Sequence, residues 1–414
     1  MTDAQLKRRT LWLCTVLHGF THLYQVALIP LYLLIQKDLG LAGEEQATFL
    51  VTALSIAYFL PSYPMGMLAD RVSRRKLLTI GLALNASAYV GLSFAPTYAM
   101  AIVCVMLAGL GGSFYHPAAP RLSARLLPAD TGTALGKVGS GASMGFFFAP
   151  LYAGWRAETA GWRQPVLELG VLGLVAAAAF WMLAKDHPPA NEPSRSDGNT
   201  SPVPVKMFAT PMLWFCFLAM SLAFCFRDFA GSGMATLGSL FLQKAHGFDS
   251  RQTGIALSLL YLASIISNPL FGHLSDRGSV RWTTLVLALA ALFIFIFPRV
   301  STAAAIPSLV AYGFFFMASF PMVEAALMQS VHDTVRGRVF GFFITVGGLL
   351  GNLSHWFIGT WVRRLGETAS APASYFGLFN LLAVFVLISL AGLAFLHVLR
   401  QRDTAQTNLS LPTK

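Results

Sequence analysis

Three histidines could carry chemistry in the first half of the chain. His18 and His22 stand four residues apart in an apolar run, so both imidazoles would lie on one face of a helix. His116 precedes Pro117 in "GGSFYHPAAPRLSAR", and a proline inside a helix kinks it because one backbone hydrogen bond is lost. Imidazole titrates near neutral pH, so we expect the kink to turn His116 toward His18 and His22 for proton coupling or substrate contact. The alternative is a histidine that only hydrogen-bonds an adjacent helix.

The spacing of His18 and His22 also allows metal binding. A metal site needs at least a third ligand close in space, and the sequence identifies none. We therefore predict no metal and no cofactor, and interhelical hydrogen bonding stays open as a purely structural alternative for this pair.

In the second half, Arg227 and Asp228 are adjacent in a long apolar run. Neighbouring side chains on a helix diverge by about 100°, so we expect each to need a separate partner. The run is longer than one membrane span requires, and "AGSGM" at Ala230–Met234 offers a break of the kind at which transporters often bind substrate. Lys137, Glu324 and His355 are further ionisable groups inside apolar runs.

These side chains belong to a chain of 414 residues that is 55% hydrophobic and only 11% charged. Soluble domains average about 25% charged residues, so the composition indicates a membrane protein. The net charge of +11 would suit nucleic acid, but the basic residues form short clusters between apolar runs, which is a membrane-topology pattern. We expect no nucleic-acid partner. The cysteines lie in apolar runs without metal-binding spacing and are predicted to be buried hydrophobes: Cys14, Cys104, Cys216 and Cys225.

Twelve apolar runs approach the roughly 20 residues that a membrane-spanning helix needs. They lie near 11–35, 46–66, 77–94, 98–121, 131–157, 164–184, 209–242, 250–272, 282–298, 301–328, 335–362 and 373–399. The fold class predicted is an all-α membrane protein of twelve transmembrane helices in two pseudo-symmetric six-helix bundles. We place the N-terminal bundle at 1–186, a Pro/Ser-rich linker at 187–207, and the C-terminal bundle with a short tail at 208–414.

An internal repeat supports the two bundles. "GMLADR" at Gly66–Arg71 returns as "GHLSDR" at Gly272–Arg277, and Pro117 and Gly136 have counterparts in Pro321 and Gly341 at nearly the same spacing. A six-plus-six duplication is typical of transporters. Of the 29 Lys and Arg residues, 19 fall on the side of the termini and linker and 8 on the opposite side. Cytoplasmic loops carry the basic excess, so we expect both termini in the cytoplasm, in a bacterial inner membrane.

The sequence resembles the major facilitator superfamily. "GMLADRVSRRKLL" is similar to that family's loop between spans 2 and 3, and "GHLSDRGSVRW" is a degenerate second copy. "FYHPAAPRLSARL" resembles span 4 of the fosmidomycin-resistance group, and "GASMGFFFAP" resembles the span-5 antiporter motif through Gly141, Gly145 and Pro150. The loop motif implies a conformational latch. We expect Asp70 to contact the start of span 11 in one access state, within the latch set Gly66, Asp70, Arg71, Arg75, Gly272, Asp276 and Arg277.

In the resembled family, spans 1, 4, 7 and 10 line a central cavity. Six ionisable groups of this chain follow that division, and spans 5 and 11 add Lys137 and His355. We assign all of them to a substrate and proton cavity: His18, His22, His116, Lys137, Arg227, Asp228, Glu324 and His355. The predicted function is alternating-access, proton-coupled export of a small polar or anionic organic solute or drug by a monomer in the lipid bilayer. The alternatives are a proton-coupled uptake symporter for an organic anion such as a carboxylate, and a polytopic membrane enzyme built on the three histidines.

Overall fold

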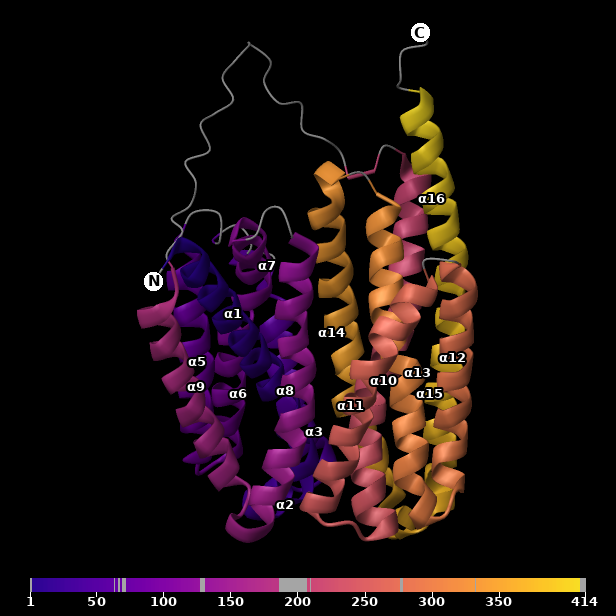
Figure 1. Cartoon of the computed structure of the whole chain (residues 1–414). Coiled ribbons are helices and arrows are strands. Elements are labelled where there is room, and N and C mark those ends of the chain that lie inside the picture. The colour runs from indigo at the N-terminus through magenta and orange to yellow at the C-terminus, as the bar shows by residue number, and fades with distance from the viewer. Residues whose placement is uncertain are drawn as a thin grey trace.

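Every regular element that the structure describes is a helix, as the apolar runs predicted. The structure, a computed structural model, describes residues 2–62, 64–65, 68, 72–126, 131–185, 207–208, 210–275, 278–331 and 333–409. Within these ranges, nine helical segments are long and apolar enough to cross a membrane by length and composition. The remaining long helices, α3, α5 and α8, pack beside them (Figure 1).

The helices before residue 186 form the first half of the molecule. They are α1 (Asp3–Val26), α2 (Tyr32–Asp38), α3 (Glu44–Phe59), α5 (Arg74–Ser93), α6 (Tyr98–Gly112), α7 (Tyr115–Leu126), α8 (Thr131–Ala160) and α9 (Arg163–Leu183), with a short 3₁₀ turn, η1 (Ile29–Leu31), between α1 and α2.

The helices after residue 206 form the second half. They are α10 (Pro211–His246), α11 (Ser250–Ser275), α12 (Ser279–Ile296), α13 (Thr302–Gln329), α14 (Asp333–Leu365), α15 (Phe376–Ser389) and α16 (Ala391–Leu409). Short 3₁₀ turns follow α12 and α14: η3 (Phe297–Arg299), η4 (Gly366–Ser370) and η5 (Pro372–Tyr375).

Local sequence sets several helix ends. The hydroxyl groups of Ser73, Thr97 and Thr210 accept hydrogen bonds from backbone N–H groups in the first turns of α5, α6 and α10. Such caps satisfy donors that a helix start otherwise leaves unpaired. At the other end of α10, Gly247 takes a left-handed conformation with φ of 70°, which glycine adopts without steric cost.

The predicted kink at Pro117 is present. α6 ends at Gly112 and α7 begins at Tyr115, so the helix breaks beside Ser113, whose carbonyl loses its usual partner because Pro117 has no N–H. The predicted break at Ala230–Met234 is wrong, because α10 runs unbroken through it. Glycine costs a helix interior only about 1 kcal/mol, and here Gly231 lets the ring of Phe316 lie directly against the α10 backbone.

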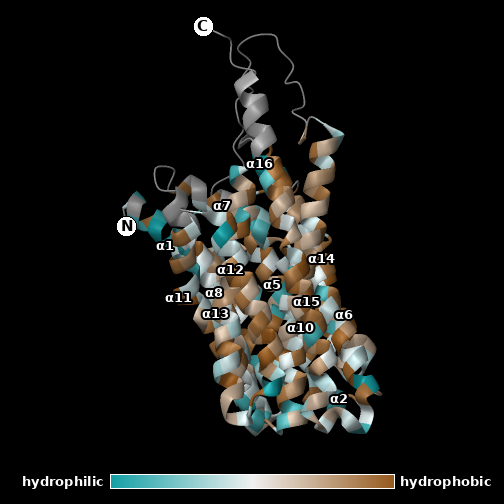
Figure 2. Cartoon of the chain, turned by 90° about the vertical axis from the view of Figure 1, so that its right-hand side faces the viewer, coloured by the Kyte–Doolittle hydropathy of each residue, from teal (hydrophilic) through white to brown (hydrophobic). Residues whose placement is uncertain are grey.

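The two sets of helices lie side by side as two upright groups, and the start of α1 and the end of α16 lie at the same end of the molecule (Figure 1). We call this end the terminal end and the opposite one the closed end. Hydrophobic residues dominate the body, and hydrophilic residues concentrate toward the two ends (Figure 2). Exposed side chains such as Trp155, Met182, Phe215 and Ile266 belong to the apolar outer surface that a bilayer would cover. The four cysteines are free and buried, as predicted.

Candidate functional site

The two halves are joined at the closed end by direct contacts across the molecule. The main contacts pair α3 with α14 and α8 with α11. Where α8 crosses α11, a Cβ on Gly154 would collide with the Ser250 carbonyl, so the two backbones touch. Ion pairs link Glu44 to Lys244 and Glu45 to Arg363 at the same end.

A polar network extends this closure deeper between the halves. The Thr52 hydroxyl donates to the Asn352 carbonyl at 3.0 Å, and the Ser55 hydroxyl donates to the Asn352 side-chain oxygen at 3.2 Å. His355, placed by the sequence in the substrate cavity, belongs to this network. It is 3% exposed, with Nδ1 2.6 Å from the Thr236 hydroxyl and Nε2 3.1 Å from Asn352 Oδ1. His355 therefore joins α10 to α14 within the second half and holds Asn352, the residue that receives the hydrogen bonds from the first half.

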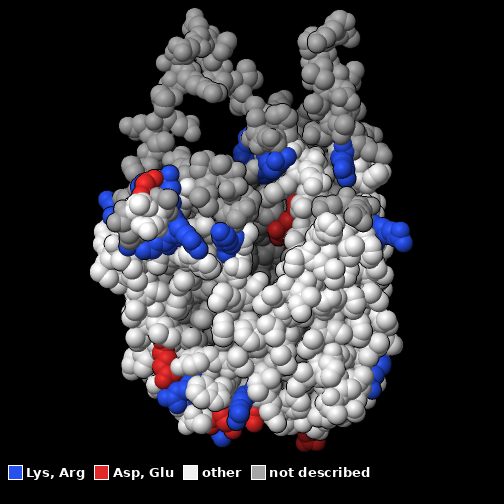
Figure 3. Space-filling model, viewed as in Figure 1, with Lys and Arg blue, Asp and Glu red and all other residues white. Residues whose placement is uncertain are grey.

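Toward the terminal end the surface is hollowed between the two halves, with acidic atoms inside the hollow (Figure 3). The described residues of the two halves are thus in contact at the closed end, and the surface between them is hollowed toward the terminal end (Figure 3). Two clusters of predicted site residues lie between these ends, one in each half.

The first cluster unites the three histidines, as the sequence predicted for His116. One ring nitrogen from each of His18, His22 and His116 lies within 4.8 Å of the others. The Nε2 atoms of His18 and His22 are 3.1 Å apart. His18 is 9% exposed, and the other two are partly buried. The ring nitrogens of His116 have no hydrogen-bonding partner among the described residues, so the bond to an adjacent helix that we considered is not present.

Outer contacts fix the orientation of two of these rings. His18 Nδ1 lies 2.7 Å from the Val138 carbonyl of α8, and His22 Nδ1 lies 2.8 Å from the side-chain oxygen of Gln25. The ring of Tyr115 stacks on His18 with centroids 4.6 Å apart. Sequence reasoning did not identify Gln25, Val138 or Tyr115. Only the position of Gln25, one turn after His22, gave a sequence signal.

The antiporter-like glycines explain why α1 lies so close to α8. A Cβ on Gly141 would collide with the Thr15 carbonyl, and one on Gly145 would collide with the Gly19 carbonyl. The resulting contact of two backbones places His18 against Val138. Pro150, the last residue of the motif, contacts α11 and not α1. Its carbonyl oxygen lies against Gly254, where an added Cβ would collide with it.

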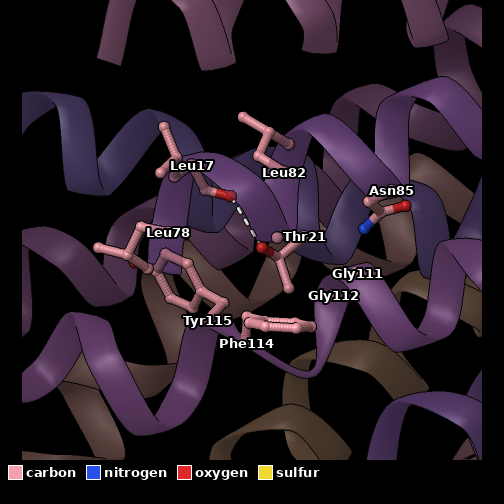
Figure 4. Close-up of a pocket in the computed structure, with 10 residues that line it drawn as sticks. Leu17, Thr21, Leu78, Leu82, Asn85, Gly111, Gly112, Phe114 and Tyr115 are labelled. Carbon is pink, nitrogen blue, oxygen red and sulfur yellow. Dashed lines mark hydrogen bonds between the residues drawn. The ribbon is translucent and has the colours of Figure 1, made fainter. Parts of the chain in front are cut away.

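A small cavity lies beside this cluster, bordered by α1, α5 and the α6–α7 break (Figure 4). Its volume is about 10 Å³, close to the minimum for one water molecule. Thr21, Asn85 and Tyr115 are among its lining residues, and Asn85 Oδ1 is buried without a hydrogen bond. Tyr115 therefore separates this cavity from the ring of His18.

The second cluster contains Arg227 and Asp228, and it corrects the expectation that these neighbours need separate partners. The Nε and an Nη atom of Arg227 donate to Asp228 Oδ1 at 2.9 and 2.8 Å. The arginine side chain is long enough to fold back along the helix, so the divergence of the two Cβ atoms does not keep the charged groups apart. The remaining Nη lies 3.5 Å from the Ser319 carbonyl, and the guanidinium stacks on Phe320 at 4.1 Å.

Arg227 is 1% exposed, whereas Asp228 is 17% exposed. α14 makes room for Asp228 at Gly347 and Gly351, where an added Cβ would meet the aspartate side chain. Glu324 of α13 is partly buried and within electrostatic range of both Arg227 and Asp228. It has no direct hydrogen-bonding partner among the described residues. The cluster is therefore the ion pair of Arg227 with Asp228, and Glu324 adds a second carboxyl group nearby that is not bonded to the guanidinium.

Lys137 joins neither cluster. Its side chain is exposed near the start of α8, and only its backbone carbonyl takes part in the α1–α8 contact, accepting from the Thr15 hydroxyl at 3.3 Å. Exposure near the end of a span is typical of a lysine that extends toward the lipid headgroups.

Most of the predicted latch falls outside the described residues, namely Gly66, Asp70, Arg71, Asp276 and Arg277. Gly272 lies in α11 with open space around its Cα. Arg75 contacts the end of α9, where it donates to the Ala184 carbonyl at 3.4 Å and lies 4.6 Å from the centre of the Trp181 ring.

Comparisons with known proteins agree with this architecture. A probable sulfoacetate transporter of Cupriavidus necator is 25% identical over 81% of this chain and 82% of its own length. The multi-drug resistance efflux pump PmrA of Streptococcus pneumoniae is 24% identical over 84% of this chain and 87% of its own. A bacterial homologue of the human lysosomal transporter Spinster, solved in an inward-facing and unoccupied conformation, superposes with a TM-score of 0.78 at 16% identity, covering 96% of this chain and 97% of that one.

These relatives are transporters rather than enzymes, which removes the hypothesis of a membrane enzyme built on the three histidines. The family model described as Major Facilitator Superfamily matches residues 11–355, which include both clusters and, apart from the ion pair to Arg363, the named contacts that close one end. The protein is therefore an integral membrane transporter that belongs to the major facilitator superfamily.

Proposed function

We propose that the protein exports a small polar organic solute or drug in exchange for protons, with Glu324 and Asp228 as the groups at which proton and solute compete. The observation that carries this proposal is the second cluster, in which the buried guanidinium of Arg227 pairs with Asp228 while a second carboxyl group, Glu324, lies nearby without a direct partner among the described residues. The efflux pump among the relatives supports the outward direction.

Exchange requires that proton and solute exclude each other. The Glu324 carboxyl group has no direct partner among the described residues, so it is free to bind a proton or to accept a hydrogen bond from a solute. Once protonated, it loses the negative charge that attracts a donor or a cation. Ionisable groups inside a membrane are costly and usually functional, which favours this role over a structural one.

A second candidate function is uptake of an organic anion together with protons. The relative named as a probable sulfoacetate transporter favours it. In this chain an anion could reach Arg227 only by replacing Asp228, because Asp228 and the Ser319 carbonyl occupy the guanidinium. Protonation of Asp228 would release Arg227, so proton and anion would bind together and not in competition.

The sign of a proton movement distinguishes the two functions. Solute would be added to the purified protein in weakly buffered detergent solution containing a pH-sensitive dye, with ethidium and sulfoacetate as the probes. An exchanger releases protons as solute binds, whereas a symporter takes them up. We expect release with ethidium, and Glu324→Gln should abolish it. His273→Gln, which removes an exposed titratable group of α11 outside both clusters, is the matched control and should leave the release intact. Proton uptake with sulfoacetate and no response to ethidium would replace export by uptake.

Finer features of the transporter are part of the same proposal. We propose cytoplasmic termini in a bacterial plasma membrane, a monomer, two six-helix bundles divided at 187–207, and a place in the fosmidomycin-resistance-like group. The charge distribution and the span-4 stretch support these assignments. We also propose that Asp70 anchors a latch at the start of α14 when the terminal end closes, because the helix dipole there favours a carboxylate.

A further inference from the structure

The three histidines of the first cluster are arranged in a way that their own hydrogen bonds do not explain. The Val138 carbonyl can only accept, so His18 Nδ1 carries the proton and donates it. His22 Nδ1 donates in the same way to the Gln25 oxygen. In both neutral rings the lone pair is therefore on Nε2, and these two Nε2 atoms face each other 3.1 Å apart. Two lone pairs at this distance repel unless a cation or a shared proton lies between them.

The separation fits a metal ion. Imidazole nitrogens bind zinc at 2.0–2.1 Å, so two ligands of a tetrahedral ion lie about 3.3 Å apart. His116 adds a third nitrogen within 4.8 Å of the others, and it has no competing hydrogen bond among the described residues. The outer contacts match as well, because metal-binding histidines almost always donate their second N–H to a carbonyl or carboxylate oxygen.

We propose that His18, His22 and His116 form a binding site for one divalent transition-metal ion of the zinc, cobalt or nickel class. Three neutral imidazoles favour these ions over magnesium and calcium, which prefer oxygen ligands. A site with three protein ligands keeps a fourth position open for water. His22 and His116 are partly exposed, so an ion can reach the cluster. The site lies in the first half, away from the Arg227 cluster, and it does not depend on the exchange mechanism.

The helices around the site position its three histidines. Gly141 and Gly145 hold α1 against α8, so the Val138 carbonyl reaches His18. The break at Ser113 and Phe114 turns the first residues of α7 toward α1, where Tyr115 stacks on His18 and His116 meets both other rings. The α1–α8 contact and the α6–α7 break thus bring the three rings together. His116, which has no hydrogen bond among the described residues, can turn inward from within 4.8 Å to complete the site.

Cobalt provides a direct test, because four-coordinate Co²⁺ absorbs strongly in the visible range. The full chain would be purified with a tag that contains no histidine, stripped of metal in detergent, and titrated with Co²⁺ and then Zn²⁺. We expect one Co²⁺ per chain, a visible band typical of four-coordination, and its loss as Zn²⁺ displaces the cobalt. Mg²⁺ should displace nothing.

Substitutions test whether these three histidines are the residues that bind the ion. His22→Ala and His116→Ala should each weaken Co²⁺ binding beyond the roughly 10–100-fold loss expected for Gln25→Leu, which removes an outer contact only. His273→Ala, which removes an exposed histidine of α11, is the matched control and should bind like the parent chain. Melting temperatures in metal-free buffer would show that each variant is folded, and Gln25→Leu keeps all three ligands should an alanine variant fail to fold.

Two results would overturn the proposal. One is the absence of saturable one-to-one Co²⁺ binding in the parent chain, which would leave a shared proton as the cation between His18 and His22. The other is binding that persists unchanged in folded His22→Ala and His116→Ala. Since the readout is binding and not transport, neither result bears on proton exchange at Glu324.

Discussion

The Arg227 cluster and the histidine cluster place polar side chains inside an apolar protein in two different ways. In the second half, Arg227 and Asp228 sit on one continuous helix, and opposite charges compensate each other directly. In the first half, three uncharged rings from two helices converge where the chain is broken between α6 and α7, and no acidic group takes part among the described residues. The comparison shows two different requirements. An ion pair between adjacent residues needs only a side chain long enough to fold back, as in Arg227. Bringing together three histidines from two helices needs a particular path of the backbone.

This difference predicts where each half is sensitive to mutation. The second cluster should depend on the identity of its charges and tolerate small backbone shifts. The first should depend on the glycines and the break that set its geometry.

The largest effect is expected from Arg227→Met. It leaves Asp228 without its guanidinium, and removing one partner of a buried ion pair costs about 3–5 kcal/mol. Adding Asp228→Asn should restore part of that stability because no unpaired charge remains. Chemical unfolding in detergent measures both effects. A double variant no more stable than Arg227→Met alone would mean that the pair is not held by charge. The stability of Arg227→Lys should lie between those of the parent chain and Arg227→Met, since lysine keeps the charge and loses the planar contact with Phe320.

A smaller effect is expected from Gly141→Ala at the contact of α1 with α8. The added Cβ collides with the Thr15 carbonyl, so the helices must separate at a cost of about 1–3 kcal/mol. The shift would also lengthen the bond from His18 to Val138 and weaken Co²⁺ binding. Gly139→Ala is the matched control on the same helix, where nothing lies within 4 Å of the new atom. It should be neutral or stabilising by up to about 1 kcal/mol. Equal unfolding curves for the two variants would refute the tight contact.

The smallest effect is expected from Tyr115→Phe. The ring still stacks on His18, but the hydroxyl no longer donates to the Cys14 carbonyl, a bond of 2.8 Å worth about 1 kcal/mol. Unfolding should register that loss while Co²⁺ affinity stays the same. Tyr115→Leu removes the ring too and should lower both. If Tyr115→Phe weakens cobalt binding as strongly as Tyr115→Leu, then the hydroxyl and not the stacked ring orients His18.

Much of the fold followed from the sequence, because spans and breaks depend on local chemistry. Each predicted apolar run coincides with helix in the described residues, and the break next to Pro117 follows from a missing N–H. The same local reasoning failed at Ala230–Met234. Glycine permits a break without requiring one, and packing against Phe316 decided in favour of a continuous helix.

The sequence by itself determined that the chain crosses a membrane, where its helices lie, and that His18 and His22 share one face, since hydropathy and helical periodicity are properties of neighbouring residues. Only the tertiary structure decided which distant residues meet. Nothing local brings Val138 to His18, His116 to His22, or His355 to Thr236, and the folding back of Arg227 onto Asp228 depends on the rings and carbonyls packed around it. Those contacts form where two helices pack closely. The distance between such helices is set by the glycines at their crossing points and by the packing of the two halves against each other.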